Sequence, residues 1–446
     1  MSAVPTHVVS LRIAFLGVCA ALGACATYTP LPLDTHVTAK QQASELHTDT
    51  ALPTRLTVAD VERLALDNNP QLIAARSRRG VAQAQLRSAG ILPNPVLTAS
   101  DGFLLSGPGT VEALAAGLSL DLKALVTLSS KRGAARHSAQ AVDADLLWQE
   151  WQTLAKARLQ AVDIIEGARQ LDLLHSNSTL WNEQLERDRR ALAQADTTLV
   201  AFAPELAAGA DAQKQLDDFA RAQATRRRDL AILLGLAPDV AIELDDQIDL
   251  QTLDADAVRA GLVDLADRRP DLIALQLGYR AQEDKVRGAI LAQFPALTFG
   301  FSGGRDTSDV RTFGPQITLD LPLFDRNQGN IAQERATREQ LHAEFAARLI
   351  AATSEVQALL ADRQTLQTQL AAKRVLLAGM APMAASAQKA FRNGDLDART
   401  YVDLVTTRNA RQQDILALES TLLEQQVAIA TLMGAGMPPA TLPDME

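Results

Sequence analysis

Residues 317–336, ITLDLPLFDRNQGNIAQERA, change from one periodicity to another within a few positions. Apolar and polar residues alternate up to Phe324, as they do in a strand with one apolar face. A polar joint containing Gly329 follows, and then a run rich in Ala, Gln, Glu and Arg that favours a helix. The stretch therefore predicts a strand that leads into a helix.

A weaker copy of this junction, LSLDLKALVTLSSKRGAARHSAQA, occupies residues 118–141. The segments 70–98 and 270–298 align without a gap and share nine identities in 29 positions, which indicates a duplicated structural unit. We expect each unit to contain a helix of about 25–30 residues, two strands, a very long helix and a shorter return helix. The predicted boundaries are a first repeat at 56–250 (strands about 96–122, helical hairpin 131–235), a second repeat at 256–434 (strands about 296–323, hairpin 329–433) and a C-terminal tail at 435–446. In the first repeat we expect a longer linker between strand and helix than in the second.

The predicted strands have the length and pattern of membrane β-strands, about 9–11 residues with one apolar face. On this interpretation Asp121 and Asp320 lie on the polar strand faces and line the lumen of a pore. Four strands cannot close a barrel, whereas twelve strands from three chains would enclose an aqueous lumen. A soluble sheet packed on one face has the same pattern, so the strands alone leave both alternatives open.

The N-terminus has the features of an export signal. Arg12 precedes the apolar run IAFLGVCAALGA, and Leu22-Gly23-Ala24-Cys25 resembles a bacterial lipobox. We therefore expect a lipoprotein signal peptide at 1–24, acylation of Cys25 and a lipid-anchored extension at 25–55, with an ordinary signal peptide as the alternative. Ala26 favours the outer membrane by resemblance to bacterial sorting rules.

Composition excludes several classes of function. The net charge of −10 lacks the basic footprint of a nucleic-acid-binding protein. The six histidines are scattered without metal-ligand spacing, and the sequence contains no nucleophile-elbow or phosphate-loop motif. We therefore expect no catalytic residues, no bound metal and no cofactor.

The motifs, taken in order, resemble those of the TolC-type outer-membrane efflux channels. They are LALDNNPQL, ILPNPVL, LLGLAP, LADRRPDLIAL, AQFPALTFGFS, PLFDRNQGNI and AFRNGD with TYVDL, spread over residues 56–436. The motif PLFDRNQGNI is similar to the CzcC-type branch, whose members serve heavy-metal efflux pumps. The resemblance implies a mainly α protein with a β-barrel part, in which three chains share a 12-stranded barrel and project long coiled-coil hairpins into the periplasm.

The same resemblance implies a function and partners. The chain would conduct substrate passively as a homotrimer in the outer membrane of a Gram-negative bacterium, together with a periplasmic adaptor and an inner-membrane pump of the resistance–nodulation–division class. Heavy-metal cations are the expected substrate. Drugs or organic compounds remain the first alternative, and a lipid-anchored periplasmic adaptor or scaffold is the second.

Acidic residues constrict the periplasmic entrance in this family. Asp403 in TYVDL corresponds to the first of them, whereas the second position is occupied by Thr406. We expect Asp403 to contribute to the gate, with Arg399 as a pairing charge and Asp211 as its counterpart in the first repeat.

The resemblance also implies that the hairpin tips contact the adaptor. We expect these tips around 207–211 and 393–397, where Gly209, Asn393 and Gly394 are the candidate contact residues.

Overall fold

The computed structural model describes residues 28–49 and 51–440, so the predicted signal peptide and Cys25 lie outside the described residues. Residues up to Ala39 form a unit separate from the remainder. The described part of that unit, residues 28–39, contains no helix or strand. Everything that follows concerns the larger unit, which begins at Lys40.

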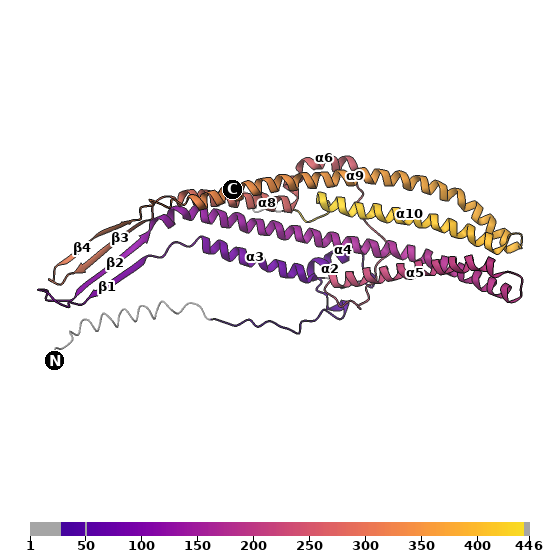
Figure 1. Cartoon of the computed structure of the whole chain (residues 1–446), viewed down its shortest axis with the longest axis horizontal. Helices are drawn as coiled ribbons and strands as arrows, with labels where there is room; N and C mark the ends of the chain where they lie inside the picture. The colour runs from indigo at the N-terminus through magenta and orange to yellow at the C-terminus, as the bar shows by residue number, and fades with distance from the viewer. Residues whose placement is uncertain (1–27, 50, 441–446) are drawn as a thin grey trace. The chain divides into compact units, whose positions relative to one another are not determined.

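The larger unit contains the two predicted repeats, each with two strands followed by a long helix and a return helix (Figure 1). After a short 3-10 turn, η1 (Ala43–Glu45), the first repeat consists of α2 (Val58–Asn68), α3 (Pro70–Ala89), β1 (Val96–Gly102), β2 (Ala113–Asp121), α4 (Leu122–Ala193) and α5 (Leu199–Leu233). The second repeat consists of α6 (Ala255–Gly261), η2 (Leu262–Asp264), α7 (Leu265–Arg268), α8 (Pro270–Leu291), β3 (Leu297–Arg305), β4 (Arg311–Leu319), α9 (Gln328–Asn393) and α10 (Ala398–Met433).

The single helix predicted before each strand pair is wrong, because the chain breaks immediately before a proline in both repeats. Asn69 has an extended ψ of 119°, since Pro70 disfavours the helical conformation of the residue that precedes it. The Asn69 side chain accepts a hydrogen bond from the backbone N–H of Leu72 and donates one to the carbonyl of Leu233 at 2.8 Å. Arg269 and Pro270 make the equivalent break in the second repeat.

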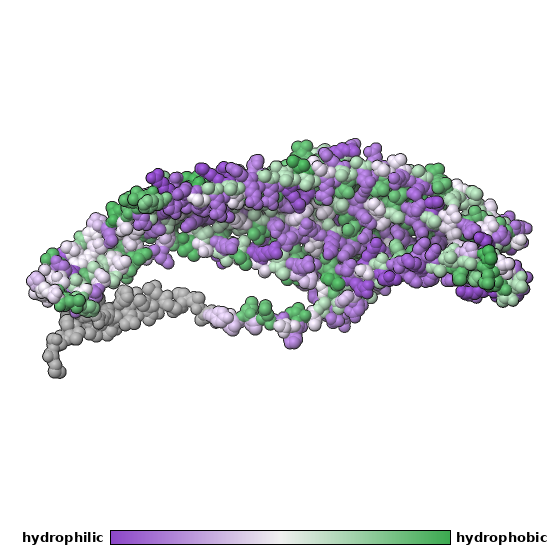
Figure 2. Space-filling model, viewed as in Figure 1, coloured by the Kyte–Doolittle hydropathy of each residue, from purple (hydrophilic) through white to green (hydrophobic). Residues whose placement is uncertain are grey.

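The four strands form one antiparallel sheet in the order β1-β2-β3-β4, and the central β2–β3 pair joins the two repeats. Its register places Leu97, Leu118, Phe301 and Pro315 side by side, and these residues belong to an apolar face. On the same face the ring of Phe301 stacks on that of Phe313, with centroids 6.0 Å apart. The apolar side chains are nevertheless exposed within the single chain; Phe313 is 80% exposed. Figure 2 shows this end as pale and green, whereas purple dominates the helices.

The strand–helix junctions differ from the prediction in where they begin and end. In the first repeat α4 starts at Leu122 without a linker, because the Asp121 carboxylate accepts hydrogen bonds from the N–H groups of Lys123 and Ala124 and caps the helix. In the second repeat β4 stops at Leu319, before Pro322, which has no N–H to donate to a neighbouring strand. The expectation of a longer linker in the first repeat is therefore wrong, since the longer one precedes α9.

The helix α4 is the centre around which the larger unit is packed. Its 72 residues correspond to roughly 108 Å at 1.5 Å per residue. It packs against α2, α3, α5, α8 and α10. One hydrophobic core forms where α2, α4 and α5 meet and includes Val61, Ala161 and Leu230. A second core, which includes Leu272, Val356 and Ile429, joins α8, α9 and α10. Within the described residues no helix has the length and apolar character needed to cross a membrane.

Candidate functional site at the hairpin ends

The first hairpin turns at residues 194–198, so the predicted tip at 207–211 is wrong. The helix α4 ends at Ala193, and α5 starts at Leu199 after Thr198, whose hydroxyl accepts a hydrogen bond from the N–H of Ala201. Pro204 is the sixth residue of α5, so the helix continues through it although one i→i−4 hydrogen bond is missing there. Pro204 therefore did not mark a turn.

Gly209 is buried inside the first hairpin and does not lie at its tip. A Cβ atom at this position would lie 2.5 Å from Cδ1 of Leu185 on α4. The absence of a side chain thus permits the close approach of α5 to α4. The structure contradicts our expectation that Gly209 lies at an exposed tip.

The second hairpin turns where the sequence predicted, at residues 394–397. Asn393 is the last residue of α9, and Gly394 follows in the left-handed conformation, with a φ of 81°. The Asp397 carboxylate accepts hydrogen bonds from the N–H and the hydroxyl of Thr400 and caps α10. These bonds lower the pKa of Asp397. Contact of Asn393 and Gly394 with an adaptor remains a prediction.

The two predicted acidic gate residues occupy different levels of their helices. Asp403 is exposed and is the sixth residue of α10, and its carboxylate has no hydrogen-bond or ion-pair partner among the described residues. Asp211 is also exposed but is the 13th residue of α5, because that helix starts earlier than predicted. Asp211 is therefore not the positional counterpart of Asp403.

Arg399 pairs with Glu205 of the first hairpin. Its Nη1 lies 3.4 Å from Oε1 of Glu205, so the contact joins α10 to α5. Glu205 is only 8% exposed, and its second carboxylate oxygen has no hydrogen-bond partner. Sequence reasoning missed this residue, although it is the only charged residue between Asp196 and Asp211, within an otherwise apolar and small stretch.

Gln184 and Asp188 of α4 complete this group of residues. We call Gln184, Asp188, Glu205 and Arg399 the hairpin-end cluster. Gln184 donates its amide hydrogens to both carboxylate oxygens of Asp188 at 3.0 Å. Burial raises the pKa of Glu205 to about 7, and a hydrogen bond and charge repulsion from Asp188 act in the same direction. Gln184 and the Arg399 guanidinium oppose this shift. The cluster can therefore gain or lose a proton near neutral pH.

An aromatic contact ties the hairpins together at the same level. The guanidinium of Arg187 on α4 lies 5.8 Å from the ring centroid of Phe391 on α9. The Phe391 ring in turn stacks on Tyr401 of α10, with centroids 4.6 Å apart. Two separate contacts thus connect the second hairpin to the first near their ends.

The two strand candidates lie at the opposite end of the helices. Asp121 is the last residue of β2 and is paired with Thr298, but its carboxylate is engaged in capping α4. Asp320 follows the last residue of β4, so its predicted position within a strand is wrong; its N–H donates to the carbonyl of Ala296 at 3.1 Å. Among residues 28–49 and 51–440, no group of three or more His, Cys, Asp or Glu side chains is arranged to hold a metal ion.

Comparison with known proteins identifies both a matching family and the fold. Residues 261–435 match the family model described as outer membrane efflux protein. The outer membrane protein OprJ of Pseudomonas aeruginosa is 25% identical over 182 residues, which cover 39% of this chain and 37% of OprJ. The cation efflux system protein CusC of Escherichia coli K12 is 25% identical, over 38% of this chain and 39% of CusC. The toluene efflux pump outer membrane protein TtgF of Pseudomonas putida is 26% identical, over 60% of this chain and 57% of TtgF. The chain thus spans between about two fifths and three fifths of these relatives.

Solved structures extend the likeness to almost the whole chain. The crystal structure of CusC has a TM-score of 0.67 at 19% identity and covers 92% of this chain and 99% of that one. The CmeC outer membrane channel of Campylobacter jejuni has a TM-score of 0.69 at 14% identity, over 93% and 96% of the two chains. The predicted TolC-like fold is therefore confirmed.

Proposed function

We propose that this chain is a TolC-type outer-membrane efflux protein and that it forms a trimeric channel, which passively conducts exported substrate from the periplasm to the exterior. The observation that carries this proposal is the four-stranded sheet whose outer strands, β1 and β4, are paired on one side only among the described residues. An open sheet edge is not tolerated in the hydrocarbon of a membrane. Three copies of the sheet give 12 strands, which close a barrel wide enough for an aqueous lumen.

The apolar face of the sheet supports a membrane location. Phe299, Phe301, Ile317 and Leu319 are between 40% and 67% exposed in the single chain, and they belong to that face. Exposed apolar surface on this scale has a stable place against lipid. The protein lies in the outer membrane, with its helices extending into the periplasm.

The long helix α9 supports assembly with further copies. Only five of its 66 residues are buried in the single chain. Ile350, Val375, Leu376 and Met383 are each more than half exposed along it. A helix of this length needs packing partners, and neighbouring copies of the chain in a closed ring supply them.

The hairpin-end cluster is suited to a gate at the periplasmic entrance. The Arg399–Glu205 ion pair holds α10 against the first hairpin, so breaking it frees the start of α10 to move outward. Asp403, one turn further along the same helix and without a partner among the described residues, adds a negative charge beside the entrance. We assign the Arg399–Glu205 ion pair to holding the entrance closed, and Asp403 to selecting cations.

Heavy-metal cations are the proposed substrate, and drugs or organic compounds are the alternative. The motif PLFDRNQGNI and the net charge of −10 favour cations, as does the likeness to CusC, whose name describes cation efflux. The comparable likeness to TtgF, whose name describes toluene efflux, favours the alternative. The proposed partners are a periplasmic adaptor, which binds the hairpin ends around 194–198 and 393–397, and an inner-membrane pump of the resistance–nodulation–division class.

Acylation of Cys25 is the proposed anchor. A Cys25→Ser variant should lose palmitate labelling in cells while the unlabelled chain is still produced. Labelling of the variant equal to that of the wild type would contradict the lipobox assignment.

The channel itself is tested in a planar bilayer with the purified oligomer. We expect stepwise conductance and, after crosslinking, a species of three chains. Absence of conductance steps, or a crosslinked series that stops at two chains, would refute the channel proposal. Growth of a deletion strain across a panel of metals and antibiotics then distinguishes the two substrate classes.

A further inference from the structure

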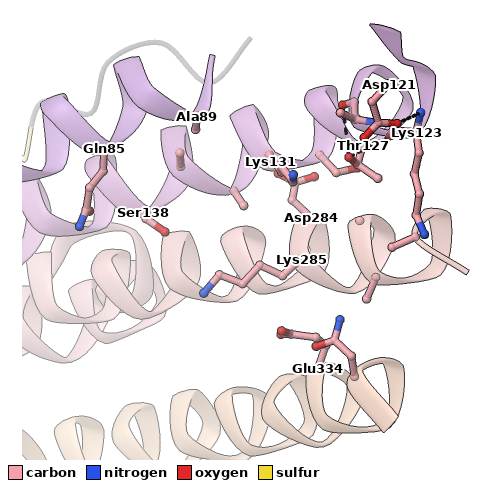
Figure 3. Close-up of a pocket in the computed structure, with 18 residues that line it drawn as sticks. Gln85, Ala89, Asp121, Lys123, Thr127, Lys131, Ser138, Asp284, Lys285 and Glu334 are labelled. Atoms are coloured by element: carbon pink, nitrogen blue, oxygen red, sulfur yellow. Dashed lines mark hydrogen bonds between the residues drawn. The ribbon is translucent and has the colours of Figure 1, made fainter. Parts of the chain in front are cut away.

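A cavity of about 730 Å³ lies beside the point where β2 leads into α4, between α3, α4, α8 and α9 (Figure 3). We call it the junction cavity. Its volume falls in the range of small-molecule binding sites. It lies at the opposite end of α4 from the hairpin-end cluster, so the gate proposed above does not account for it.

Three lysines from two helices line the junction cavity. Lys123 and Lys131 are on α4 and Lys285 is on α8. Figure 3 shows the Lys123 side chain extending from α4 toward α8. Among the described residues none of the three ammonium groups has a carboxylate within 4 Å. Three unpaired positive charges around one cavity favour an anionic ligand.

The carboxylates that line the cavity already have partners. Asp121 caps α4 through two backbone N–H groups. Asp284 contacts Nδ1 of His137 at 3.0 Å and the guanidinium of Arg287 at 3.5 Å. Glu334 accepts a hydrogen bond from the amide of Gln282. The cavity thus contains equal numbers of lysines and carboxylates, but only the lysines lack partners.

Ser130 supplies an independent indication of a ligand. It lines the junction cavity and is only 3% exposed, and its hydroxyl has no hydrogen-bond partner among the described residues. A buried hydroxyl that makes no hydrogen bond costs free energy, which a ligand with an acceptor oxygen would offset. The neighbouring Thr127 hydroxyl, in contrast, bonds to carbonyls of its own helix.

We propose that the junction cavity binds a phosphate group carried by an amphiphilic molecule. The three lysines surround the phosphate with positive charge, and the Ser130 hydroxyl donates a hydrogen bond to one of its oxygens. Alanine side chains at positions such as 89, 124 and 289 line the remainder of the cavity and suit the alkyl part of the ligand. Two sources share this chemistry, namely the headgroup of an anionic phospholipid and a small phosphate-bearing compound.

The position of the cavity favours the phospholipid. In the proposed channel the strand–helix junction lies where the membrane ends, at the level of lipid headgroups, and basic pockets at this level bind anionic lipids. This choice of source rests on the proposed function, whereas binding of phosphate to the purified chain does not. A failed binding test would therefore leave the channel proposal untouched.

The test uses the full-length protein, delipidated in a neutral detergent. One arm titrates inorganic phosphate by calorimetry, and the second measures binding of phosphatidylglycerol by native mass spectrometry, with phosphatidylcholine as the comparison lipid. The test variant carries Lys123→Gln, Lys131→Gln and Lys285→Gln. The control variant loses the same total charge at three exposed helical positions outside the cavity, through Lys156→Gln, Lys214→Gln and Lys389→Gln. Far-UV circular dichroism verifies that both variants are folded.

We expect the test variant to bind phosphatidylglycerol at least tenfold more weakly than the wild type, and the control variant to bind within twofold of it. Ser130→Ala should weaken binding several-fold without any change in charge. Lysine-dependent binding of inorganic phosphate without preference for phosphatidylglycerol would assign the site to a small phosphate compound. Equal affinity of the wild type and the test variant for both probes, or an equal loss in the control variant, would overturn the proposal.

Discussion

Glu205→Gln removes one ionisable group from the hairpin-end cluster while keeping the length of the side chain. Glu205 is almost fully buried between α4, α5 and α10, and its carboxylate faces Asp188 as well as Arg399. In the wild type we expect the local stability of the hairpin ends to fall as the pH rises through 7. In the variant this dependence should be lost.

The magnitude follows from the pKa of Glu205, which burial raises from 4.5 to about 7. Between these two values the folded protein retains a proton that the unfolded chain releases, so the folded state binds more protons and stability decreases with rising pH. The full stability is present below pH 4.5 and is lost as the pH rises through 7. The difference corresponds to roughly 3 kcal/mol at most, because each tenfold change in proton affinity is worth about 1.4 kcal/mol. The Arg399 guanidinium already offsets part of the cost of ionisation.

Hydrogen exchange detected by mass spectrometry measures this local stability, since peptides that cover residues 184–209 report on the cluster. At pH 8 we expect these peptides to exchange up to about 100-fold more slowly in Glu205→Gln than in the wild type, whereas at pH 5 the two proteins should be alike. Glu183→Gln is the matched control. Glu183 is next to Gln184 of the hairpin-end cluster on α4, but its side chain is 63% exposed. If the ratio of wild-type to variant exchange is the same at both pH values, the proposed buried proton does not exist.

The other predictions concern selectivity, packing and capping. Asp403→Asn should lower the preference of the open channel for cations over anions, measured as a reversal potential in a salt gradient. Gly209→Ala should destabilise the protein by about 1–3 kcal/mol, because its Cβ would overlap Leu185, whereas Gly379→Ala, which meets no atom within 4 Å, should be neutral or stabilising; thermal unfolding tests both. Asp121→Ala should cost about 1 kcal/mol through the lost cap of α4, and Asp320→Ala, which caps no helix, should cost less in the same assay.

Much of the fold could be predicted because two signals repeat along the chain. The alternation of apolar and polar residues identified all four strands, since a sheet with one apolar face requires a period of two. The glycines Gly394 and Gly434 marked the ends of α9 and α10, because both adopt a positive φ that other residues rarely take. Periodicity and backbone conformation are local properties, so sequence alone was sufficient for them.

The end of the first hairpin could not be predicted, because its residues serve distant packing. Gly209 allows α5 to approach Leu185, and nothing in the surrounding sequence distinguishes this use of glycine from its use in a turn. Pro204, whose missing N–H usually disfavours a helix interior, lies within α5 all the same. Glu205 was missed because its burial arises only when three helices meet. At this hairpin, the signals that failed are those whose meaning depends on tertiary contacts.

The two hairpins belong to the two copies of one duplicated unit, yet their long helices differ in how many residues they bury. Nineteen residues of α4 are buried, whereas α9 buries five in a helix of similar length. Few polar contacts join the second hairpin to the first in the half that ends at the hairpin turns. They are the Arg399–Glu205 ion pair, the Arg187 guanidinium over the Phe391 ring, and the hydrogen bond from the amide of Asn409 to that of Asn177 at 2.6 Å. Regions with few buried contacts open at low free-energy cost. An opening motion of the entrance should therefore separate α9 and α10 from a stationary α4 and α5. Because the packed hairpin ends hold the Glu205 proton more tightly than an opened chain does, loss of this proton as the pH rises through 7 should favour the opening motion.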